Sequence, residues 1–152
     1  MTRSDPLPRQ DWLGRLAWAL ALGAVYFATA RAALLFAFPG SNATPIWPPS
    51  GLAAALILVW GRQAVPGILL GAATANLVAF LGSGAAIGAA LAASLSISLG
   101  NAAEALLFAA ILRRFDRGVP ILGDPLAVLV FAAVAAVAAA TAAAIGVGSL
   151  VL

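Results

Sequence analysis

The chain has 152 residues, of which 64% are hydrophobic and 9% are charged, and its mean hydropathy is +1.08. Because soluble domains are about half apolar and a quarter charged, this composition excludes a water-soluble fold and predicts an all-α integral membrane protein. Eight arginines on a nearly uncharged chain give the net charge of +3 without forming a basic stripe, so we expect no nucleic-acid binding. The lack of cysteine and histidine removes thiolate metal sites and the usual general base, so we expect no enzymatic activity, no metal and no cofactor.

Five apolar stretches follow a polar tail at residues 1–11, which we expect to be cytoplasmic. The predicted transmembrane helices occupy about 12–38, 46–60, 64–81, 85–112 and 126–148, and residues 149–152 are expected to be a truncated end. The first stretch also resembles a signal peptide, but its apolar run continues to Phe38, which favours a retained helix. The second stretch is shorter than the about 20 residues that span a bilayer, so we expect it to begin inside the membrane or to pack against its neighbours.

Polar turns separate the stretches and carry the arginines unevenly. The uncharged loop at 39–50 contains four prolines, and glycines mark the turns at 61–63 and 82–84. Segments 39–50 and 82–84 contain no arginine. Seven of the eight arginines lie in segments 1–11, 61–63 and 113–117 or at Arg15. Because arginine collects in cytoplasmic loops, this distribution predicts that the N-terminus is inside the cell.

Two charged residues, Arg31 and Glu104, lie inside apolar stretches, where an unpaired charge costs several kcal/mol. With a rise of about 1.5 Å per residue, their predicted depths differ by about 5–10 Å in a hydrocarbon core about 30 Å thick. An arginine side chain is long enough to bridge that difference. A buried ion pair or hydrogen-bond network that fixes helix register is one interpretation, and a ligand-binding role or two separately solvated charges are the others.

Smaller polar side chains surround Glu104 in the sequence. Asn101 lies three residues before it, and Ser94 and Ser98 continue the same helix face. The third stretch adds a smaller polar patch that includes Asn76. Hydrogen bonding between helices is the favoured interpretation, and a polar cavity for a small ligand is the alternative.

Glycine pairs and tryptophans indicate how the helices pack and where the membrane ends. Gly67-x-x-x-Gly71 and Gly84-x-x-x-Gly88 both match the pattern that lets membrane helices approach closely. Three tryptophans fall at predicted membrane interfaces, where tryptophan is enriched, and they are Trp12, Trp47 and Trp60.

Residues 44–77 carry a more specific pattern. A Trp-Pro-Pro-Ser-Gly element at 47–51 opens a short helix, a Gly-Arg turn follows at 61–62, and a Pro-Gly-x-x-x-Gly helix then runs to Asn76. The fourth stretch adds Gly100-Asn101 and Glu104 before the arginines at 113–114. This combined spacing resembles the membrane-associated sensor domain MASE1 over roughly residues 12–148. By this resemblance, the candidate sensing residues are Trp47, Pro48, Pro49, Gly51, Arg62, Pro66, Gly67, Asn76, Asn101 and Glu104.

The resemblance implies a sensory input domain in the bacterial inner membrane, of the kind fused to histidine kinase or diguanylate cyclase modules. A typical domain of this family has more helices, so the chain resembles its N-terminal half and is expected to lack the output module. The expected partners are the lipid bilayer, a membrane protein or small-molecule stimulus, and a second copy of the parent protein. The alternatives are a small transporter or substrate-binding subunit that uses Arg31, Asn101 and Glu104, and a non-catalytic membrane scaffold.

Overall fold

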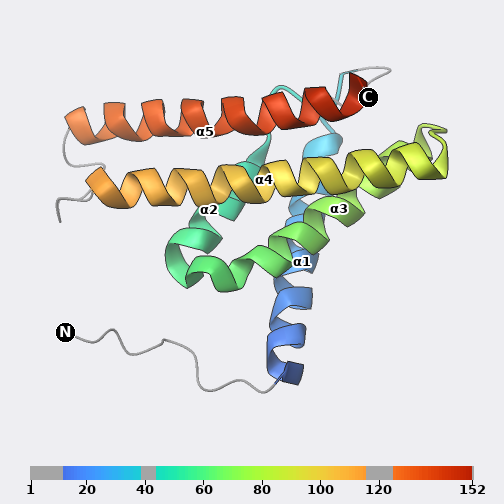
Figure 1. Ribbon diagram of the computed structural model, residues 1–152, viewed down its shortest axis with the longest axis horizontal. Coiled ribbons are helices and arrows are strands. Elements are labelled where there is room, and N and C mark those ends of the chain that lie inside the picture. The colour runs from blue at the N-terminus through green and yellow to red at the C-terminus, as the bar shows by residue number, and fades with distance from the viewer. Residues whose placement is uncertain (1–11, 39–43, 116–124, 152) are drawn as a thin grey trace.

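The computed structural model describes residues 12–38, 44–115 and 125–151, and within these ranges it contains helices and no strand (Figure 1). The expected tail at 1–11 lies outside the described residues, as do parts of the 39–50 loop and of the 113–117 segment. The elements are α1 (Trp12–Leu34), α2 (Pro48–Trp60), the 3₁₀ turn η1 (Gly61–Ala64), α3 (Val65–Gly82), α4 (Ile87–Phe115) and α5 (Pro125–Val151). The prediction of an all-α membrane bundle is therefore confirmed.

Four helical runs of the described chain are long and apolar enough to cross a membrane, and they are Trp12–Leu34, Pro48–Gly82, Ile87–Arg114 and Pro125–Ile145. The second run joins α2, η1 and α3 through a bend, from which α2 and α3 diverge (Figure 1). With 13 residues, α2 alone is shorter than the about 20 residues that a full span requires. α2 is therefore a short helix that packs against its neighbours, mainly α4.

The helices pack in an order that follows the chain. α1 lies against α3, α3 against α4, and α4 against α5, while the short α2 packs mainly on α4. In Figure 1, α4 and α5 run side by side in opposite directions. Most of the α5 surface remains exposed, as expected for a helix that has a neighbour on one face only.

Two contacts join the end of α2 to α1 and to α4. The rings of Trp18, near the start of α1, and Trp60, at the end of α2, meet edge to face with centroids 5.1 Å apart. At the end of α4, the Arg113 guanidinium donates to the backbone carbonyl of Ile57, 3.0 Å away. The segment of α1 around Trp18, the end of α2 and the end of α4 are therefore neighbours.

Two prolines and a glycine explain where α2 begins and ends. Pro48 and Pro49 occupy its first turn, where their missing N–H groups leave no helical hydrogen bond unmade. The Trp-Pro-Pro element thus opens the helix, with Trp47 as the preceding cap residue. At the other end, Gly61 adopts φ 63°, a left-handed conformation that favours glycine, and its N–H returns to the Ile57 carbonyl.

The glycines of α3 allow α1 to approach at backbone distance. A Cβ atom added at Gly71 would lie 2.6 Å from the Gly23 carbonyl oxygen and 2.7 Å from the Tyr26 Cβ. A Cβ atom added at Gly67 would lie 2.5 Å from the Leu22 Cβ. No side chain larger than hydrogen fits at these two positions, so the Gly67-x-x-x-Gly71 prediction of close helix packing is confirmed.

The second glycine pair behaves differently, and the prediction for it was wrong. Gly84 and Gly88 have open space around them, with no atom within 4 Å of an added Cβ. Gly84 lies in the turn before α4 with φ 84°, so it serves the turn and not a helix interface. The glycine of α4 that does permit close packing is Gly100, where an added Cβ would lie 3.3 Å from the Cγ2 atom of Ile145 in α5.

We expect the substitution Gly71→Ala to lower the stability of the chain by about 1–3 kcal/mol, because the added methyl group overlaps the backbone of α1. Thermal unfolding of the purified chain in detergent measures this as a lower midpoint temperature. Gly88→Ala is the matched control, since it adds the same methyl group to a helical glycine with open space around it. Equal effects of the two substitutions would contradict the assigned α1–α3 contact.

Candidate functional site

A hydrogen bond between Ser50 and Glu104 lies inside the bundle. The Ser50 hydroxyl donates to the Glu104 Oε2 atom at 2.9 Å, and only 8% of the Glu104 surface is exposed. Ser50 occupies the first turn of α2, next to the two prolines. The N-terminal end of a helix carries a partial positive charge that stabilises a nearby carboxylate. The start of α2 therefore provides both a hydrogen bond and a favourable field to the one acidic side chain inside an apolar helix.

Two further aromatic residues adjoin this pair. Tyr26 of α1 is fully buried, and its hydroxyl faces the Trp47 indole and lies within electrostatic range of Glu104. The geometry between Tyr26 and Trp47 falls short of a hydrogen bond, and the hydroxyl has no other hydrogen-bond partner among the described residues. A buried polar group without a partner costs free energy. The Tyr26 hydroxyl is therefore available to another polar group in this region.

Asn101 is a second buried polar residue with an unused donor. It lies three residues before Glu104 on α4, and residues at this spacing share one face of a helix. Its Nδ2 atom makes no hydrogen bond to any residue that the structure describes. The face of α4 that carries Glu104 thus offers an acceptor and, one turn away, an unused donor.

An apolar cavity of about 330 Å³ opens beside Glu104 between α2, α4 and α5. Ser50 and Glu104 provide its polar groups, and Phe108 and Phe131 meet edge to face on its wall with ring centroids 5.2 Å apart. A cavity of this kind suits a small apolar ligand that carries one polar group. The remaining lining residues are Gly51, Ala54, Ala55, Leu58, Ala105, Ala135 and Ala138.

Side chains of α4 hold α2 at both of its ends. Glu104 accepts from Ser50 in the first turn of α2, and Arg113 donates to the Ile57 carbonyl near its last turn. Arg113 also approaches the Leu58 carbonyl at 3.4 Å. Since a helix rises about 1.5 Å per residue, Glu104 and Arg113 are about 13 Å apart along α4. This spacing is sufficient to reach both ends of a short helix.

The structure brings some of the predicted sensing residues together and leaves others apart. Trp47, Pro48, Pro49 and Gly51 form the start of α2 beside Glu104, and Gly51 lines the cavity. In contrast, Asn76 donates its amide to the Ala72 carbonyl of its own helix.

Three other predicted residues have separate places in the fold. Gly67 belongs to the α1–α3 contact, away from the cavity. Arg62 and Pro66 are exposed, in the η1 turn and at the start of α3 respectively. Arg62 and Pro66 thus belong to the bend between α2 and α3, and neither lines the cavity beside Glu104.

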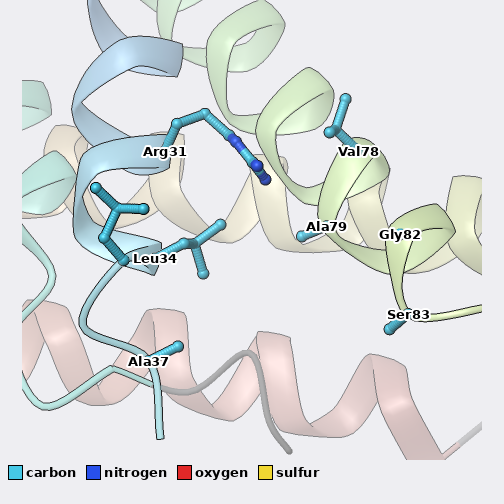
Figure 2. A pocket seen from close by; sticks show the side chains of 8 residues that line it. Arg31, Leu34, Ala37, Val78, Ala79, Gly82 and Ser83 are labelled. Carbon is cyan, nitrogen blue, oxygen red and sulfur yellow. The ribbon is translucent and has the colours of Figure 1, made fainter. Parts of the chain in front are cut away.

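The ion pair considered for Arg31 and Glu104 is not formed in the described part of the chain. Glu104 is hydrogen-bonded to Ser50. Arg31 lies instead in the last turn of α1, exposed, beside a second cavity that α1 forms with the end of α3 (Figure 2). The two charges therefore belong to different sites.

Sequence reasoning did not identify three residues of this region. Ser50 was considered only as the small residue of the Trp-Pro-Pro motif, although a hydroxyl in the first turn of a buried helix is a signal of its own. Tyr26 is the only tyrosine of the chain and lies in an apolar helix, which was a second available signal. The bond from Arg113 to α2 had no local signal, because it joins residues 56 positions apart.

Comparison with known proteins identifies one family. The sequence model described as MASE1 matches residues 18–152, which is most of the chain, and it confirms the resemblance seen in the sequence. No curated protein and no solved structure matches the chain.

We expect Ser50→Ala to lower the stability by about 1 kcal/mol, because Glu104 then loses its hydrogen-bond donor inside the bundle. Thermal unfolding in detergent, with Glu104→Ala and the double variant, gives the coupling between the two side chains, because alanine removes the acceptor. Ser83→Ala is the control, since that exposed hydroxyl bonds only to a carbonyl of its own turn. Additive losses in the double variant would show that the Ser50–Glu104 bond does not stabilise the fold.

Proposed function

We propose that this chain, which belongs to the MASE1 family of membrane-associated sensor domains, is the sensory input of a bacterial signalling protein of the histidine kinase or diguanylate cyclase type. On this proposal the output module lies outside these 152 residues, and the chain resides in the inner membrane with its N-terminus in the cytoplasm. The family and the apolar helices make the chain a multi-pass membrane protein. The type of output and the stimulus are the proposed part.

The observation that supports a sensory role is the Ser50–Glu104 hydrogen bond at the edge of an apolar cavity. Ionisable residues inside membrane helices are costly, and they commonly mark functional sites. Glu104 is reachable from the cavity, and its bond to Ser50 is one that a ligand donor group can replace. A ligand in the cavity would therefore compete directly with an internal contact of the protein.

The consequence of that competition follows from how α2 is held. If a ligand takes the Glu104 carboxylate, the first turn of α2 loses its anchor on α4, while Arg113 still holds the other end. α2 then has two packing arrangements against α4, and the ligand favours one of them only by binding it more tightly. α4 continues to Arg113 and Arg114, which face the cytoplasm under the proposed orientation, so a shift of α2 against α4 reaches that side.

The cavity also indicates the chemical class of the stimulus. Its walls are alanine, leucine and phenylalanine side chains with one carboxyl group, so the best fit is a small apolar molecule that carries a single amine or hydroxyl donor. Such a molecule also partitions into the membrane, from which the cavity between the helices is approached. We therefore propose an amphipathic amine or alcohol as the ligand class.

A matched pair of probes tests this ligand class. We expect benzylamine to raise the unfolding temperature of the purified chain and toluene, which has the same ring without the donor, to raise it less. The difference between the probes should disappear in Glu104→Gln, since the amide removes the charge that the ammonium group recognises. If both probes act equally on both proteins, the cavity does not recognise a donor group through Glu104.

Signal output in the complete gene product tests the assignment as an input domain. We expect Glu104→Ala and Ser50→Ala to change autophosphorylation or cyclic di-GMP synthesis in isolated membranes several-fold, because both substitutions remove the hydrogen bond that holds the first turn of α2. Ser83→Ala should leave the output unchanged at the same protein level. A complete gene product with neither activity in the wild type would contradict the proposed type of signalling protein.

A further inference from the structure

Arg31 occupies a cavity that is separate from the Glu104 site. The cavity has a volume of about 400 Å³ and lies between the C-terminal ends of α1 and α3. Figure 2 shows the Arg31 side chain extending from α1 toward Val78 and Ala79 of α3. Gly82 and Ser83 complete the α3 side. The guanidinium of Arg31 is thus directed into a cavity whose other lining residues carry no charge.

No protein group neutralises this arginine in the described part of the chain. The structure contains neither a hydrogen bond nor an ion pair from Arg31 to any other described residue. The segments that join helices at this end, residues 35–47 and 83–86, contain no acidic residue. Glu104, the one acidic residue inside the helices, is buried and bonded to Ser50.

The backbone carbonyls at the helix ends are also occupied. The carbonyls of Ala32, Ala33 and Leu34 at the end of α1 accept from the next N–H groups along the chain. At the end of α3, the Phe80 carbonyl accepts from the backbone and the hydroxyl of Ser83, and the Leu81 carbonyl accepts from Gly84. Within the described residues, the guanidinium of Arg31, with its five N–H donors, makes no hydrogen bond to any of these carbonyls.

Arg31 lies in the last turn of α1, near the end of the helix. Large apolar side chains follow it directly, with Leu35 83% and Phe36 74% exposed. Exposed leucine and phenylalanine of this size lie in contact with lipid in a membrane protein. A long basic side chain near the end of a membrane helix can extend to the polar headgroup region.

We infer that the cavity between the ends of α1 and α3 binds a phosphate-bearing anion through the Arg31 guanidinium. The planar fork of arginine matches two oxygens of a phosphate group, and the hollow provides the space in front of it. The phosphate belongs either to the headgroup of a phospholipid or to a free phosphate ion, and the chemistry at Arg31 is the same. This site is independent of the stimulus proposed for Glu104, and neither proposal requires the other.

The test uses the full chain purified in dodecyl maltoside, titrated with phosphatidylglycerol and followed by native mass spectrometry. We expect Arg31→Gln to raise the apparent Kd for this lipid about tenfold, the factor that corresponds to 1.4 kcal/mol. Ala79→Leu should raise it similarly, because the larger side chain fills the cavity and leaves the charge in place. Diacylglycerol with the same acyl chains lacks the phosphate and should bind weakly to every variant.

Arg15→Gln is the control for a general loss of charge, since Arg15 is an exposed arginine near the other end of the same helix. Stabilisation by inorganic phosphate at constant ionic strength separates the two sources. If inorganic phosphate stabilises the wild type but not Arg31→Gln, the phosphate group alone is sufficient for binding. If phosphate has no effect and Arg31→Gln weakens lipid binding, the site binds a lipid headgroup. The inference is overturned if Arg31→Gln and Ala79→Leu bind phosphatidylglycerol like the wild type, or if Arg15→Gln weakens binding equally.

Discussion

A carboxylate inside an apolar bundle has to be held by hydrogen bonds, and in this protein that requirement determines where α2 lies. Glu104 can be stabilised by the hydroxyl and the positive end of a helix, and the start of α2 provides both. The prolines fix the first turn of α2 so that Ser50 is the first residue there with a polar side chain. The cavity beside α2 exists because a short helix of small residues covers only part of the facing surfaces of α4 and α5.

The bundle contains a rigid contact between α1 and α3 and a contact between α2 and α4 that can rearrange. α1 and α3 meet through glycines at backbone distance, so neither helix can shift relative to the other without losing this packing. α2 and α4 meet through two side-chain hydrogen bonds, one at each end of α2, with a cavity alongside. Hydrogen bonds can be exchanged for bonds to a ligand, whereas interlocked backbones cannot. This contrast is the physical basis for our proposal that α2 is the element that moves.

The candidate site was predictable in part. Glu104 could be identified from the sequence because a lone acidic residue in a long apolar run is costly wherever it lies. The hydrogen-bond partner of Glu104 could not be identified from the sequence. The only available criterion was approximate depth in the membrane, and both Arg31 and Ser50 satisfied it. The two glycine pairs show the same limit: Gly67-x-x-x-Gly71 and Gly84-x-x-x-Gly88 match one pattern, yet only the first faces another helix.

The sequence by itself determined that the chain is a helical membrane protein, where its helices begin and end to within a few residues, and to which family it belongs. These properties follow from composition, from prolines and glycines, and from motif spacing, all of which are local along the chain. Only the tertiary structure decided that Ser50 binds Glu104, that Arg113 holds the far end of α2, and that Arg31 lies at another cavity. The reason is that apolar helices of similar composition have no preferred neighbour in lipid, so their pairing depends on which small surfaces and polar groups meet in three dimensions.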